Sequence, residues 1–120
     1  MSRFSLDQPD PIVRQAPSVE LTCWEKVIRD AKYYKIPNPI IDLMQERNEI
    51  GIERYNTPLM PHNGRDAGSD AMCETLDLLA YLQQIKLERP NDVDLGYLDL
   101  FYQKILDNLP LLYKYVNKPK

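Results

Sequence analysis

Two acid pairs, separated by a break rich in proline and glycine, are the residues of this chain best placed to do chemistry. Glu46 and Glu49 form an E-x-x-E pair, and Glu74 and Asp77 form an E-x-x-D pair. Carboxylates three residues apart share one face of a helix, and such hard oxygen ligands suit Mg²⁺ or Mn²⁺. Antiparallel packing of the two helices would bring the pairs together, so the sequence predicts a four-carboxylate metal site.

Each pair belongs to a longer stripe along its predicted helix. The first stripe has carboxylates at i, i+4, i+7 and i+11, namely Asp42, Glu46, Glu49 and Glu53. The second repeats this spacing with three carboxylates and a tyrosine, namely Asp70, Glu74, Asp77 and Tyr81. Like charges at i, i+4 destabilise a helix by a few tenths of a kcal/mol, which favours a functional reason for them. The alternative is that both stripes are the solvated faces of ordinary amphipathic helices.

Prolines and helix-capping residues organise the rest of the chain. They predict an N-terminal arm over residues 1–17 and one helical domain over residues 18–120. Helical periodicity predicts four helices, at about 18–34, 38–54, 66–87 and 91–108, with a short final turn beginning at Pro110. Short connections favour antiparallel neighbours. We therefore predict an all-α fold, a compact antiparallel bundle of about four helices with an extended N-terminal arm.

The segment "PHNGRDAGSD" between the acid pairs is the chemically densest loop. Asn63 and Gly64 predict a tight turn, and Asp66 or Ser69 can cap the helix that follows. Backbone N–H groups at that helix start, with Arg65 nearby, could receive a phosphate. The structural alternative is that this loop only reverses the chain, with Arg65 paired to a neighbouring carboxylate.

Composition narrows the classes of function. The net charge is −3 and no block of Lys or Arg precedes the tail "NKPK", which disfavours nucleic acid as the main partner. No apolar run approaches the roughly 18 residues that span a bilayer, and the N-terminus lacks the apolar core of a secretory signal. Cys23 and Cys73 have no zinc or disulfide spacing. We expect a cytoplasmic protein without a membrane partner, in which a divalent cation mediates any phosphate contact.

The segment from about 40 to 88 resembles the MazG-like all-α nucleotide pyrophosphohydrolases. Their signature is E-x-x-E, a spacer, then E-x-x-D on consecutive helices, and this chain places twenty-four residues between Glu49 and Glu74. The context "CETLDLLAYLQQI" is similar to the apolar E-x-x-D helix of that family. The spacer "RYNTPLMPHNGRDAGSDA" looks more like a distinct group of small phage-encoded proteins, in which case the compartment would be the cytoplasm of the host.

The resemblance implies Mg²⁺-dependent (or Mn²⁺-dependent) hydrolysis of a nucleoside triphosphate to a monophosphate and pyrophosphate. The metal ligands would be Glu46, Glu49, Glu74 and Asp77. Either Glu53 or Asp70 would help to deprotonate the attacking water. The substrate-binding candidates are polar, basic or aromatic, namely Arg54, His62, Asn63, Arg65, Tyr81, Lys86 and Lys104.

Two other functions remain open at this point. One is a non-catalytic binding protein that sequesters a nucleotide or a nucleotide-derived signal, and the other is a small helical protein-interaction module. In every case we expect a homo-oligomer, because four short helices with so many Leu, Tyr and Phe positions bury limited area alone.

Overall fold

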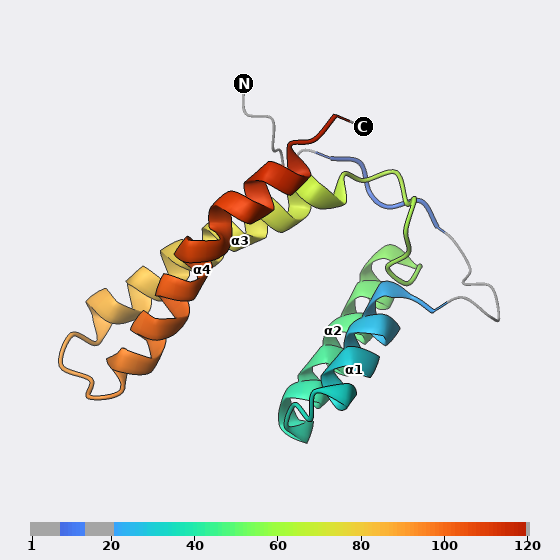
Figure 1. Cartoon of the computed structure of the whole chain (residues 1–120). Helices are drawn as coiled ribbons and strands as arrows, with labels where there is room; N and C mark the ends of the chain where they lie inside the picture. The colour runs from blue at the N-terminus through green and yellow to red at the C-terminus, as the bar shows by residue number, and fades with distance from the viewer. Residues whose placement is uncertain (1–7, 14–20, 120) are drawn as a thin grey trace. The chain divides into compact units, whose positions relative to one another are not determined.

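The chain folds into helices connected by turns and loops. A computed structural model describes residues 8–13 and 21–119. The helices are α1 (Cys23–Tyr33), α2 (Asn38–Tyr55), α3 (Ala67–Glu88) and α4 (Leu95–Val116), as Figure 1 shows. No strand occurs within the described ranges. The prediction of an all-α fold with about four helices is confirmed.

These helices form two antiparallel hairpins in two compact units. The α1–α2 unit comprises Pro9–Arg65, and the α3–α4 unit comprises Met1–Gln8 and Asp66–Lys120. Within each unit the two helices pack side by side and run in opposite directions (Figure 1). The expectation that residues 18–120 form one packed domain stays a prediction.

A capping box sets the start of α1. The Thr22 hydroxyl accepts a hydrogen bond from the Glu25 N–H (3.2 Å), and the Glu25 carboxylate accepts one from the Thr22 N–H (2.9 Å). The predicted helix start near Ser18 was wrong, because residues 21 and 22 are not helical. Ser18 itself lies outside the described residues. The first N–H groups of a helix have no carbonyl partner within the helix, and the reciprocal Thr-x-x-Glu pair satisfies two such groups at the start of α1.

The α2 and α3 boundaries follow the sequence signals closely. The α2 helix begins at Asn38, with Pro39 in its first turn and no side-chain cap. It ends at Tyr55 and is capped by Asn56, whose left-handed φ of 55° is a conformation that Asn tolerates. The predicted cap of α3 is confirmed, because the Asp66 carboxylate accepts a hydrogen bond from the Ser69 N–H (3.2 Å).

The last helix corrects a prediction. The expected start near residue 91 and the expected stop near Asn108 were both wrong, because α4 begins at Leu95 and runs through Pro110 to Val116. Proline removes one backbone hydrogen bond, so other contacts must hold the final turns. A Cβ placed on Gly68 would lie 3.1 Å from the Cβ of Val116, which shows that the end of α4 packs closely against the start of α3. This packing explains why the helix continues.

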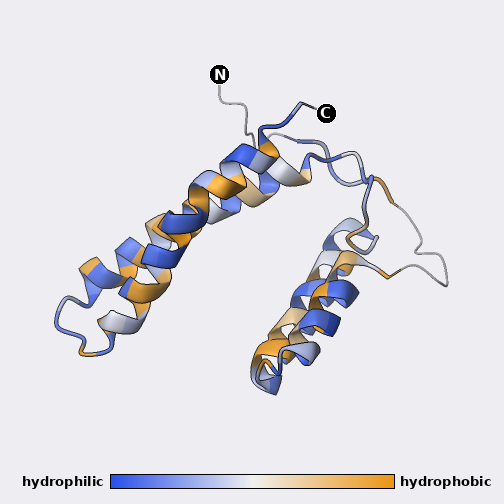
Figure 2. Ribbon diagram, viewed as in Figure 1, coloured by the Kyte–Doolittle hydropathy of each residue, from blue (hydrophilic) through white to orange (hydrophobic). Residues whose placement is uncertain are grey.

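The buried apolar core is small. It consists of Ala31, Ile41 and Met60 in the α1–α2 unit and Met72 and Leu82 in the α3–α4 unit. Figure 2 shows apolar positions recurring along both hairpins, yet no residue of α4 is buried. None of the helices within the described ranges combines the length and apolar character that crossing a bilayer requires.

Candidate functional site: two acidic helix faces and a mixed-charge groove

The second acid pair lies on one face of α3, as its spacing predicts. Glu74, Asp77 and Tyr81 are exposed and line a groove of about 470 Å³, whose remaining wall is Thr75 and Leu78. Two carboxylates and an aromatic ring therefore face the same space. Such a surface can present oxygen ligands to a cation and a flat ring to a planar ligand group.

The first acid pair lies on α2. Glu46, Glu49 and Glu53 are all exposed, and Glu49 also lines a groove between α1 and α2. The helix therefore presents the E-x-x-E carboxylates to solvent rather than burying them. Exposed carboxylates keep their hydration and remain free to bind a cation.

The two acid pairs belong to different units, so their convergence on one metal stays a prediction. Within residues 8–13 and 21–119, no group of three or more His, Cys, Asp and Glu side chains is arranged to hold a metal ion. Each helix offers one pair. One or two carboxylates together with substrate phosphates are the set that Mg²⁺ commonly takes, so the donors present fit this ion.

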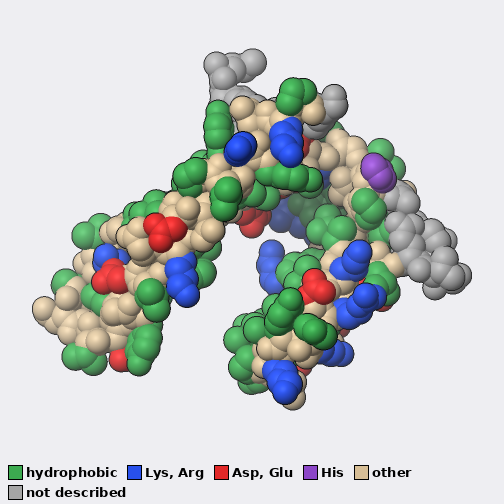
Figure 3. Space-filling view, viewed as in Figure 1, with side chains coloured by type: hydrophobic (Ala, Val, Ile, Leu, Met, Phe, Trp, Pro, Cys, Tyr) green, Lys and Arg blue, Asp and Glu red, His purple; other side chains and the backbone are tan. Residues whose placement is uncertain are grey.

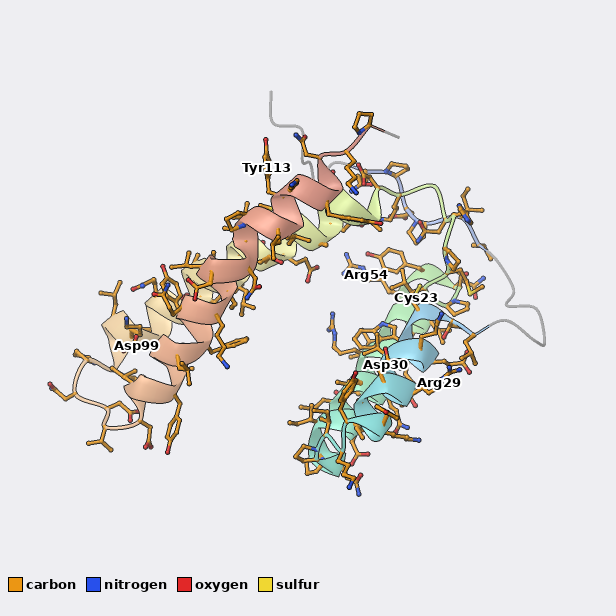
Figure 4. All side chains as sticks on the ribbon, in the orientation of Figure 1. Cys23, Arg29, Asp30, Arg54, Asp99 and Tyr113 are labelled. Carbon is orange, nitrogen blue, oxygen red and sulfur yellow. The ribbon has the colours of Figure 1, made fainter. Side chains whose placement is uncertain are left out.

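A second groove, of about 680 Å³, runs between α1 and α2. Its lining is mixed in charge and comprises Leu21, Glu25, Ile28, Arg29, Lys32, Gln45, Asn48 and Glu49. Arg29 projects from α1 in Figure 4, and Figure 3 shows several Lys and Arg side chains gathered over this unit. We call this space the α1–α2 groove.

Two cations and one amide oxygen of the α1–α2 groove have no ion-pair or hydrogen-bond partner among the described residues. Neither Arg29 nor Lys32 has a carboxylate within 4.0 Å in the part of the chain that the structure describes. The nearby Glu25 carboxylate is engaged in the capping box of α1. The Asn48 Oδ1 atom is buried and accepts no hydrogen bond from any described residue.

Sequence reasoning missed these groove residues. The signals available were the i, i+3 spacing of Arg29 and Lys32 and the position of Asn48 directly before Glu49. Both are common in solvated helix faces, so neither pattern alone points to a site. Only the pairing of α1 with α2 brings the two cations and the amide to one groove.

Several predicted substrate-binding residues have contacts within their own units. Lys86 of α3 forms an ion pair with Asp99 of α4 and lies 5.8 Å from the centre of the Tyr102 ring. The Arg54 guanidinium lies 5.2 Å from the centre of the ring of its neighbour Tyr55. Lys86 thus ties α3 to α4, and the substrate roles of both cations stay predictions.

Lys104 lies in a different setting from the other predicted cations. It lines a groove of about 300 Å³ whose surface is almost entirely apolar, together with Thr75 of α3 and four residues of α4, namely Ile105, Asn108, Leu109 and Leu112. The aliphatic stem of a lysine can cover such a surface while its amine stays hydrated. The substrate role of Lys104 also stays a prediction.

The loop before α3 uses its polar atoms to hold the N-terminal arm. The Asn63 side chain accepts a hydrogen bond from the Arg65 N–H (3.1 Å), and the Asn63 carbonyl accepts one from the Ile12 N–H (2.7 Å). The Arg65 guanidinium donates to the Pro9 carbonyl (2.8 Å). His62 is exposed with a φ of 57°. These contacts favour the structural reading of the loop, and the ligand roles of these three residues stay predictions.

Asp70, one of the two candidate proton acceptors, has a hydrogen-bond partner in its own unit. Its carboxylate accepts a hydrogen bond from the Gln8 side chain (2.8 Å). The same amide group also bonds the backbone N–H and carbonyl of Asp66. Gln8 therefore holds the N-cap residue Asp66 and the first turn of α3, which carries Asp70.

Comparison of the chain with protein-family models, with curated proteins and with solved structures finds no match.

Proposed function

We propose that this protein hydrolyses a nucleoside triphosphate to a monophosphate and pyrophosphate with the help of Mg²⁺. The observation that carries the proposal is the groove on α3, where Glu74 and Asp77 face the same space as Tyr81. The exposed Glu46 and Glu49 on α2 supply the other half of the MazG-like signature. Carboxylates beside an aromatic ring suit a ligand that has both metal-bridged phosphates and a planar base.

The residues that would hold Mg²⁺ are Glu46, Glu49, Glu74 and Asp77. When bound, Mg²⁺ would neutralise phosphate charge and lower the pKa of a water molecule. Either Glu53 or Asp70 would accept the proton that this water loses as its oxygen bonds to phosphorus. The bond from that phosphorus to the bridging oxygen breaks, and the electron pair leaves with pyrophosphate. Tyr81 would orient the base by stacking.

Pyrophosphate release tests this proposal. We expect the purified full-length chain, incubated with Mg²⁺ and a panel of ribonucleoside and deoxyribonucleoside triphosphates, to release pyrophosphate from at least one of them. Glu74→Gln and Glu49→Gln should each lower the rate by about 100-fold, because each would remove a ligand of the Mg²⁺ that neutralises phosphate charge. Asp42→Asn is the matched control, since Asp42 is exposed on α2 but lies outside the signature. The proposal fails if every nucleotide is recovered intact.

A second candidate function is capture of a nucleotide or nucleotide-derived signal without hydrolysis. The two cations of the α1–α2 groove favour it, because neither has a carboxylate partner among the described residues. The same assay separates the two functions. Under this alternative, the nucleotide binds to the protein and is later recovered unchanged.

A further inference from the structure

The α1–α2 groove combines two cations that form no ion pair, two carboxylates and an unused hydrogen-bond acceptor among the described residues. Arg29 and Lys32 lie three residues apart on α1, so their side chains share one face of that helix. Asn48 reaches the same groove from α2, and its buried Oδ1 accepts no hydrogen bond within the described ranges. A buried carbonyl oxygen without a donor is costly, which makes it rare unless something else satisfies it.

We propose that the α1–α2 groove binds the phosphate chain of a nucleotide-like ligand, with Arg29 and Lys32 as phosphate contacts and Asn48 Oδ1 as acceptor for an N–H or O–H group of that ligand. This proposal names the place where the phosphates of the substrate are held, and in that respect it rests on the proposed function. Its test uses binding alone, so the two proposals can fail separately.

Phosphate is the anion that this pair of cations suits best. The planar fork of an arginine matches two phosphate oxygens, and a lysine beside it adds a point charge. The Glu25 carboxylate, one turn from Arg29, accepts a hydrogen bond from the Thr22 N–H and forms no ion pair with Arg29 among the described residues. Both cations therefore keep their charge available to a ligand.

Glu49 gives the groove a property that a simple basic patch lacks. Its carboxylate lines the same space as the two cations, so it repels a phosphate chain when no metal ion is present. Removing this charge should strengthen phosphate binding in a chelating buffer, although the proposed function needs the same carboxylate for hydrolysis. The effects of one substitution on binding and on hydrolysis thus have opposite signs.

The experiment measures binding of inorganic tripolyphosphate and of ATP to the full-length chain by calorimetry in buffer with EDTA. We expect Arg29→Gln and Lys32→Gln to raise the Kd for both probes by about 10-fold, which corresponds to one lost charge-assisted contact. Arg47→Gln and Lys26→Gln are matched controls on the same two helices, outside the groove lining, and should change the Kd less than 2-fold. Glu49→Gln should lower the Kd for tripolyphosphate by about 3-fold.

Asn48→Leu separates the acceptor from the cations. It should leave the Kd for tripolyphosphate within about 2-fold and raise the Kd for ATP by about 5-fold, because only ATP carries amino and hydroxyl donors. Arg29→Lys serves as a folding control and should restore part of the affinity lost in Arg29→Gln.

Three results would overturn the proposal. The first is that neither probe binds. The second is that the groove and control substitutions change the Kd equally. The third is that Glu49→Gln binds tripolyphosphate more weakly than the wild type. Binding that depends on Arg29 in a protein that releases no pyrophosphate would keep the proposal and reject hydrolysis.

Discussion

Single residues show how much of the chain's polarity is used to build structure. The Asn63 side chain accepts a hydrogen bond from the Arg65 N–H, and the Asn63 backbone carbonyl accepts one from the Ile12 N–H. Gly64 has a φ of 86°, and a Cβ there would lie 3.1 Å from the Ile12 side chain. The Asn-Gly turn was readable from sequence, because both residues tolerate turn conformations. The contact of this turn with Ile12 in the arm was not readable, since Ile12 lies 51 positions before Asn63 in the chain.

The buried Asn48 side chain leads to a prediction about stability. Replacing Asn48 by Leu should raise the free energy of unfolding by about 1 kcal/mol without ligand, because it removes a buried acceptor that has no partner among the described residues. Urea denaturation followed by the fluorescence of Trp24 measures the change.

Asn108→Leu is the control for this stability change. Asn108 is an exposed residue within α4, so the control gains the same helix propensity but loses the bond to the Lys104 carbonyl. An Asn48→Leu variant less stable than the wild type would show that the amide is satisfied in the native protein.

At the scale of elements, helix limits were predictable where a local signal sets them. Asp66 caps α3 through its own side chain, and Asn56 ends α2 in the left-handed conformation. The continuation of α4 through Pro110 was not predictable. It depends on close packing between Val116 and Gly68, two residues that no local pattern connects.

Two glycine substitutions test this account of the helices. Gly51→Ala should raise the free energy of unfolding by about 0.5–1 kcal/mol, because no atom lies within 4 Å of the added Cβ apart from the immediate backbone. Gly68→Ala should be less stable than Gly51→Ala, since its Cβ would lie 3.1 Å from the Val116 side chain, which must shift to make room.

Thermal unfolding followed by circular dichroism measures both glycine variants. If Gly68→Ala stabilised the protein as much as Gly51→Ala, the final turns of α4 would not pack against α3 as described.

At the scale of the molecule, the exposed apolar surface stands out. A hairpin buries only one side of each helix, and large apolar residues remain exposed on α4, among them Tyr97 (77%), Leu111 (66%) and Tyr115 (70%). Large apolar side chains left exposed in this number are typical of a surface that associates with another chain. We therefore propose, as the sequence also suggested, that copies of this chain associate with one another.

Sedimentation velocity across a range of protein concentrations tests this association. We expect a mass at least twice that of the 120-residue chain at micromolar concentration. Leu111→Glu should shift the distribution toward the monomer, because it places a charge on an exposed apolar position of α4. Lys114→Glu is the charge-changing control on the same helix, at a position that is already polar. A monomer at all concentrations would contradict the proposal.

Local sequence patterns predicted the all-α class, the approximate positions of four helices, a cap at Asp66 or Ser69 and the acid pairs on single helix faces. Periodicity and capping depend on residues three or four positions apart, so one stretch of chain contains the whole signal. Tertiary structure alone decided the α1–α2 groove, the partners of Asn63 and the extension of α4 beyond Pro110. Each of these depends on residues distant in the chain, whose meeting is governed by packing between helices and leaves no pattern in either stretch alone.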